Sequence, residues 1–149
     1  MTNNENALLK TIGFSEIGRD LLAHSDNGYN VLYGGGLFHG YEDHPRKNIT
    51  ANGITSTAAG KYQILAHIFD YYKANLQLPD FSPASQDKIA LQLIKEVKAD
   101  VLINDGQFQE AIKRCSTRWA SLPGSLYRQH TNNMTYLEAF YENIGGSIA

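Results

Sequence analysis

The chain has 149 residues, of which 42% are hydrophobic and 19% charged, and its formal net charge is −2. This balance excludes a disordered or membrane-embedded chain and predicts one domain over residues 1–149 that can bury a core. The slight negative charge gives little support to a nucleic-acid partner, which normally needs a concentrated basic face. The single cysteine, Cys115, excludes an internal disulfide framework.

The N-terminal sequence MTNNENALLK lacks a basic region followed by an apolar segment, as a secretory signal peptide would have. No later apolar run reaches the length of about 18 residues that a membrane span needs. We therefore expect synthesis in the cytoplasm without a signal peptide, and no insertion into a membrane.

The first stretch with helical periodicity, residues 4–19, places an acid on its apolar face. Leu8, Leu9 and Ile12 fall on one stripe of a helix, and Glu16 continues that stripe. With Asn3 or Asn4 as the N-cap and Gly18 near the end, Glu16 lies in the last turn, where the helix dipole disfavours a negative charge.

Two interpretations of Glu16 stay open at this point. A carboxyl group that stays protonated near neutral pH is what general-acid cleavage of a glycosidic bond requires. A helix-end glutamate that points into solvent is the simpler interpretation, and this segment alone favours it.

The rest of the chain predicts a small amount of β-structure followed by helices. Residues 26–38 indicate a short strand or hairpin that ends in three glycines, and Asn52-Gly53 indicates a second hairpin. Helices are predicted over residues 58–76, from Pro83 after a Ser82 cap, over 106–121 and over 131–143. The predicted fold class is α+β: mostly helical, with a small antiparallel β-sheet beside a cleft that has Glu16 at its edge.

Two other chemistries find little support. His39, Asp43 and His44 have no familiar zinc-ligand spacing, so we predict no metal site. Cys115 belongs to an apolar helical face, with Phe108 and Ile112, which favours a packing role over a nucleophile. A glycosidase with two carboxylates needs a partner for Glu16 at about 5 to 9.5 Å. The candidates, none of them singled out by the sequence, are Asp20, Asp26, Glu42 and Asp43.

Several blocks, in order and over most of the chain, resemble the lambda-type phage endolysins, lytic transglycosylases with a lysozyme-like fold that cleave peptidoglycan. The matching blocks are Phe14-Ser15-Glu16, GYNVLYGGGLF over 28–38, DHPRK over 43–47, STAAGKYQIL over 56–65, DFSPASQDKIALQLIK over 80–95 and RCSTRWASLPGSLYRQ over 114–129.

The resemblance implies cleavage between N-acetylmuramic acid and N-acetylglucosamine, without a metal or cofactor. Glu16 matches the family's catalytic glutamate, which protonates the leaving oxygen and then acts as a base while the muramyl 6-hydroxyl attacks C1. The product is a 1,6-anhydromuramyl end, and a second carboxylate is not needed. Gln63 and Tyr127 resemble the family's substrate-binding residues, and Tyr62, Gly60 and Ser15 are expected beside them.

The chain departs from the family at two places. Ile17-Gly18 stands where the family usually has Gly-Thr, and Asn30 where it usually has Asp. The first change could alter the pKa of Glu16, and the second favours a transglycosylase over a hydrolase.

The resemblance also implies a phage or prophage protein that lyses its host. We expect a monomer that acts on peptidoglycan glycan strands and passes from the host cytoplasm to the periplasm with the help of a holin, without a stable complex. The alternatives are a hydrolytic muramidase on the same fold and a non-catalytic glycan-binding phage module.

Overall fold

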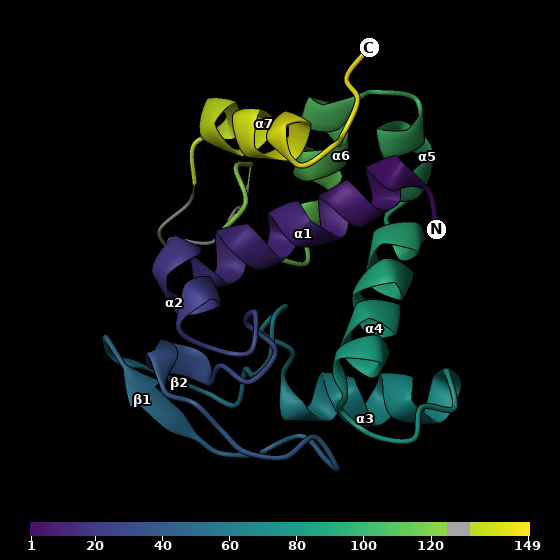
Figure 1. Cartoon of the computed structure of the whole chain (residues 1–149). Coiled ribbons are helices and arrows are strands. Elements are labelled where there is room, and N and C mark those ends of the chain that lie inside the picture. The colour runs from purple at the N-terminus through teal and green to yellow at the C-terminus, as the bar shows by residue number, and fades with distance from the viewer. Residues whose placement is uncertain (125–131) are drawn as a thin grey trace. The chain divides into compact units, whose positions relative to one another are not determined.

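A computed structural model describes residues 1–124 and 132–149. These residues form seven α-helices, one short 3-10 helix and a two-stranded antiparallel sheet, as the α+β prediction requires (Figure 1). The chain divides into two compact units: unit 1 comprises residues 1–16 and 90–149, and unit 2 comprises residues 17–89. The expectation of a single domain stays a prediction. No helix in the described ranges is long and apolar enough to cross a membrane.

The first helix of unit 1, α1 (Asn3–Ile17), begins with a capping box. The Glu5 N–H donates to Thr2 Oγ1 at 3.1 Å, and the Thr2 N–H donates to Glu5 Oε1 at 3.2 Å. The predicted cap at Asn3 or Asn4 is therefore wrong, because the Thr-x-x-Glu spacing satisfies two backbone groups together. Gly18, with a φ of 86°, follows the helix end as predicted.

The core of unit 1 confirms the predicted apolar faces. Leu8, Leu9 and Ile12 are buried on α1. In α6 (Phe108–Cys115) the side chain of Cys115 is fully buried, and burial raises its pKa to about 12. Other buried members of this core are Ile94, Ile103, Phe108, Ile112, Trp119, Leu137 and Tyr141.

The later helices of unit 1 differ from the prediction in their bounds. α6 is shorter than the predicted helix over 106–121, and α5 (Ala99–Asn104) precedes it unpredicted. α7 (Met134–Asn143) begins later than predicted because Asn133 caps it, its side chain accepting from the Tyr136 N–H. Helices α5 and α6 pack together, as do α6 and α7 (Figure 1).

Unit 2 begins with α2 (Arg19–Ala23), which was not predicted, and contains the predicted hairpin. Strands β1 (Ile49–Ala51) and β2 (Ile54–Ser56) pair antiparallel around Asn52-Gly53. The φ angles of 53° and 78° at these two turn residues are typical of a tight hairpin turn.

Residues 26–38, predicted as a short strand or hairpin, form no continuous strand, and only isolated antiparallel bridges of a hairpin are present. Val31 bridges Leu37, while the 3-10 helix η1 (Tyr33–Gly35) occupies the interval between them. Gly34 adopts a φ of 84° there, so the glycines form a tight turn in place of a continuing strand.

The helix predicted over 58–76 is also wrong in its first half. α3 (Ala66–Asn75) starts only at Ala66, whose N–H donates to Thr57 Oγ1 at 3.0 Å. Before it, Gly60 and Gln63 have φ angles of 83° and 49°, which an α-helix does not allow. α4 (Pro83–Glu96) starts at Pro83 as predicted and continues into unit 1.

Candidate active site

The acid predicted on the apolar stripe, Glu16, lies in the last turn of α1 and is partly buried. Burial raises the pKa of its carboxyl group to about 8, although part of the side chain reaches solvent. No basic residue occupies the last turn of α1. Within the described ranges, no hydrogen bond or ion pair joins Glu16 to another residue that could stabilise its negative form. The group is therefore mainly protonated at neutral pH.

Ser15, next to Glu16, is buried in a hydrogen-bond network of unit 1. Its hydroxyl lies 2.8 Å from Ser121 Oγ, and Asn132 Nδ2 donates to both Ser15 Oγ and the Ser15 carbonyl, at 2.8 and 3.0 Å. The Asn132 N–H also donates to the Ser121 carbonyl at 2.8 Å. This network fixes the turn of α1 that carries Glu16. The predicted substrate residue Tyr127 lies outside the described residues.

Three predicted substrate residues lie on one loop of unit 2, residues 59–64. Ala59 and Ile64 exchange backbone hydrogen bonds of 3.1 and 2.8 Å across it. Gln63 folds back over the loop, and its Nε2 donates to the Val31 carbonyl at 3.2 Å and to the Gly60 carbonyl at 2.9 Å. The side-chain oxygen of Gln63 accepts from no described residue, so it can accept from a ligand.

Tyr62 is almost fully buried, and its ring packs edge-on near Tyr29. The Tyr62 and Tyr29 hydroxyls both donate to Asp87 Oδ1, at 2.6 and 2.9 Å. Burial raises the pKa of Tyr62 above its ordinary range, and the negative charge of Asp87 acts in the same direction. In this conformation Tyr62 holds the loop to α4, and its expected contact with substrate stays a prediction.

Gln86, which the sequence analysis did not single out, supports the same loop from α4. Its fully buried side chain accepts from the Lys61 N–H at 3.0 Å and donates to the carbonyls of Tyr29 and Phe81 at 3.1 and 2.9 Å. A Cβ atom at Gly60 would lie 2.3 Å from Gln86 Oε1. Gly60 is thus needed where the loop meets Gln86.

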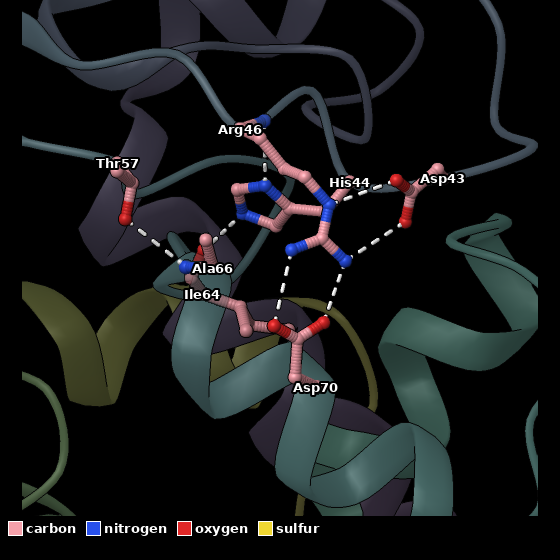
Figure 2. Close-up of polar contacts among 7 residues, drawn as sticks. All are labelled: Asp43, His44, Arg46, Thr57, Ile64, Ala66 and Asp70. Atoms are coloured by element: carbon pink, nitrogen blue, oxygen red, sulfur yellow. Dashed lines mark hydrogen bonds and ion pairs between the residues drawn. The ribbon is translucent and has the colours of Figure 1, made fainter.

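Charged residues beside the loop form an ion-pair cluster around Arg46 (Figure 2). The Arg46 guanidinium donates to Asp43 at 2.8 and 3.2 Å and to Asp70, on α3, at 3.0 and 2.5 Å. Asp43 is therefore paired with a cation, and the hydrogen bond from Arg46 lowers its pKa. No group of three or more His, Cys, Asp or Glu side chains that could hold a metal ion occurs in residues 1–124 and 132–149.

Two of the four candidates for a second carboxylate are bound to other side chains of unit 2. Asp26 accepts from the Tyr41 hydroxyl at 2.5 Å, and Asp43 pairs with Arg46. Asp20 and Glu42 are exposed.

Sequence reasoning missed Gln86, Ser121 and Asn132, and considered His44 only as a metal ligand. Each of the first three is a single polar residue whose partner lies tens of residues away. No local sequence pattern therefore indicates these three residues. The sequence offered one indirect indication, Gly60, because a glycine can mark a place where another group packs close to the backbone.

Comparisons with known proteins agree with this fold. Residues 6–148 match the family described as Endolysin. The chain is 48% identical over 124 residues to the endolysin of Escherichia phage lambda, covering 83% of this chain and 78% of that protein. It is 39% identical over 132 residues to the endolysin of Escherichia phage P2, covering 81% and 80% of the two chains.

Solved structures of the lambda lysozyme show the same architecture. One, a complex with a chitohexasaccharide, has a TM-score of 0.95 and 42% identity and is matched over 100% of this chain and 98% of that chain. A second has a TM-score of 0.90 and 43% identity over the same shares. The fold is therefore lysozyme-like, and the chain belongs to the endolysin family.

Proposed function

We propose that this endolysin is a peptidoglycan lytic transglycosylase that cleaves the β-1,4 bond between N-acetylmuramic acid and N-acetylglucosamine. Glu16 is the catalytic residue, and the product ends in 1,6-anhydro-N-acetylmuramic acid. Family membership supports action on peptidoglycan, and the related lambda lysozyme binds a chitohexasaccharide.

The reaction needs one group that first donates and then accepts a proton. Protonated Glu16 gives its proton to the bridging oxygen as the bond from that oxygen to the muramyl C1 breaks, which releases the N-acetylglucosamine hydroxyl. The oxygen of the muramyl 6-hydroxyl then bonds to C1 and passes its proton to the Glu16 carboxylate. Glu16 is protonated again at the end, and no water is consumed.

The observation that carries this proposal is the partly buried Glu16 carboxyl group with a pKa of about 8. A general acid must hold its proton at the working pH, and a group with a pKa near that pH can also take a proton back. The engagement of Asp26 and Asp43 by other side chains, and Asn30 in place of the family's usual Asp, support a mechanism without an enzymic nucleophile.

Gln63 is the best-supported substrate contact, because its side-chain oxygen is available to a sugar hydroxyl or an N-acetyl N–H. Tyr127, Tyr62, Gly60 and Ser15 stay predictions. The proposal also includes action as a monomer on glycan strands, in the periplasm after holin-dependent passage from the host cytoplasm.

Mass spectrometry of peptidoglycan digested in ¹⁸O-labelled water tests the reaction type. A transglycosylase yields muramyl ends that lack one water and carry no label. Labelled reducing-end muramic acid would instead establish the hydrolytic muramidase, which is the second candidate on this fold.

Replacing Glu16 tests the assignment of the acid. We expect E16Q to clear a peptidoglycan suspension at least about 10³-fold more slowly, since one group supplies both proton transfers. The matched control is E142Q, which makes the same change at an exposed position of α7. Equal clearing by E16Q and wild type would refute the role of Glu16, and no clearing by wild type would favour the non-catalytic glycan-binding module.

A further inference from the structure

The imidazole of His44 is a buried polar group for which the proposed reaction has no direct use. It is 2% exposed and packs against Phe81 and Phe69, with ring centroids at 4.8 and 5.9 Å. A buried imidazole that binds no metal needs hydrogen-bond partners for both ring nitrogens. Both partners are backbone groups of unit 2 (Figure 2).

The two partners determine the tautomer of His44. Nδ1 lies 2.9 Å from the Arg46 backbone nitrogen, which can only donate, so Nδ1 must be the unprotonated acceptor. Nε2 then carries the hydrogen and donates to the Ile64 carbonyl at 2.8 Å. Burial lowers the pKa of His44, and Arg46 acts in the same direction. The Ile64 carbonyl and the charges of Asp43 and Asp70 oppose this without reversing it, so the ring is neutral at neutral pH.

The Ile64 carbonyl that His44 binds belongs to the loop of Gln63. The same carbonyl accepts from the Ala59 N–H at 3.1 Å, which closes the loop over residues 59–64. Gln63 directly precedes this carbonyl and has a φ of 49°, which is uncommon for a residue with a side chain. The hydrogen bond from His44 therefore stabilises the backbone conformation that aims the Gln63 side chain at Val31 and Gly60.

The residue that binds Nδ1 of His44 is itself held by ion pairs. Arg46, whose N–H binds Nδ1, has its guanidinium bound by Asp43 and by Asp70 of α3 (Figure 2). The segment from Asp43 to Arg46 is thus bound to α3 through Asp70 and to the loop through the hydrogen bond from His44 to the Ile64 carbonyl.

We propose that His44 is a positioning residue that, as its neutral Nε2–H tautomer, holds Gln63 in its substrate-binding position through the Ile64 carbonyl. This inference rests on the proposed role of Gln63 in binding substrate. It does not depend on whether the reaction is a transglycosylation or a hydrolysis.

Two substitutions of His44 by neutral amide side chains test its two hydrogen bonds one at a time. In H44Q the amide nitrogen reaches the position of Nε2 and can still donate to Ile64. In H44N the side-chain oxygen replaces Nδ1 as the acceptor for Arg46, and nothing donates to Ile64. We expect H44N to lower kcat/KM for soluble glycan strands about tenfold and H44Q to keep it within about threefold of wild type.

A double-mutant cycle with Q63A distinguishes positioning from general destabilisation. If His44 acts through Gln63, H44N has little further effect on kcat/KM in the Q63A background, measured where every variant is folded. A tenfold loss in both backgrounds, or equal losses in H44N and H44Q, would overturn the proposal.

Nuclear magnetic resonance tests the same proposal without any activity. The nitrogen shifts of His44 should show an unprotonated Nδ1 and a protonated Nε2, and the side-chain amide signals of Gln63 should move in H44N and stay near their wild-type positions in H44Q. The opposite tautomer, or unmoved Gln63 signals in H44N, would refute the inference. Neither kcat/KM on soluble glycan strands nor these signals depend on which product forms. A hydrolytic product would therefore refute the transglycosylase without changing the outcome of the His44 tests.

Discussion

Glu16 occupies a site that suits its acid form and disfavours its ionised form, and this determines the pH dependence of the reaction. We expect kcat/KM to fall as pH rises through about 8, because the free enzyme then loses the proton that the first step needs. The profile is measured on soluble glycan strands, with circular dichroism at each pH to show that the protein stays folded. A rate unchanged to about pH 10 would contradict the assignment of Glu16 as the acid.

The same burial makes Glu16 a cost to stability at high pH. Its folded-state pKa of about 8 exceeds the ordinary value of 4.5, so the folded protein binds this proton more tightly than the unfolded chain. The stability that this tighter proton binding contributes is fully present below the ordinary pKa, and it is lost as pH rises through the folded-state pKa.

E16Q, which cannot ionise, should therefore match the wild type at about pH 4 and exceed its free energy of unfolding by about 2 kcal/mol at about pH 9. This is less than the full change in pKa implies, because the side chain partly reaches solvent. Urea unfolding at the two pH values measures the difference, and an equal effect at both would show that ionisation plays no part.

The sequence predicted the position of a residue correctly where that position depends on a single helix. The placement of Glu16 followed from Leu8, Leu9 and Ile12, because side chains at helical spacing share a face whatever the rest of the chain does. Two contacts could not be predicted: that of Asn132 with Ser15 and that of Gln86 with Gly60. In each pair the two residues lie far apart in the sequence and meet only after folding.

Among the elements, the loop over residues 59–64 shows most clearly how tertiary contacts override a local pattern. Tyr62, Phe69 and Tyr72 are all buried and have helical spacing, yet only the last two lie on α3. Gln86 and His44 satisfy the loop's backbone from outside, so Gly60 and Gln63 can adopt positive φ angles. The hairpin at Asn52-Gly53 was predictable because its turn residues alone determine it.

Two glycines with similar backbone angles test how tightly that loop is packed. Gly60 and Gly53 have φ angles of 83° and 78°, but a Cβ atom meets Gln86 at 2.3 Å in the first case and nothing within 4 Å in the second. We expect Gly60→Ala to lower the free energy of unfolding by about 3 kcal/mol, and Gly53→Ala, the control, by about 1 kcal/mol. Equal losses in urea unfolding would show that Gln86 yields to the added methyl group.

At the scale of the whole molecule, unit 1 joins the two ends of the chain. Asn4, on α1, donates to the Ile103 carbonyl at 2.9 Å and accepts from the Ser147 N–H at 3.0 Å. One side chain therefore connects three segments that lie far apart in the sequence.

Asn4→Ala should lower the free energy of unfolding by about 1 to 2 kcal/mol, because two backbone groups lose their partner. Asn3→Ala is the matched control, since Asn3 is exposed on the same turn. Thermal or urea unfolding measures both variants, and a loss no larger in Asn4→Ala than in Asn3→Ala would contradict this role.

The buried thiol of Cys115 has a practical consequence for measuring motion. It is the only cysteine of the chain, it lies in the core of unit 1, and its pKa of about 12 leaves almost no reactive thiolate. A thiol reagent can therefore modify the native protein only during the intervals in which unit 1 opens. The labelling rate, followed with and without a bound glycan, would report how often that unit opens, without any engineered probe.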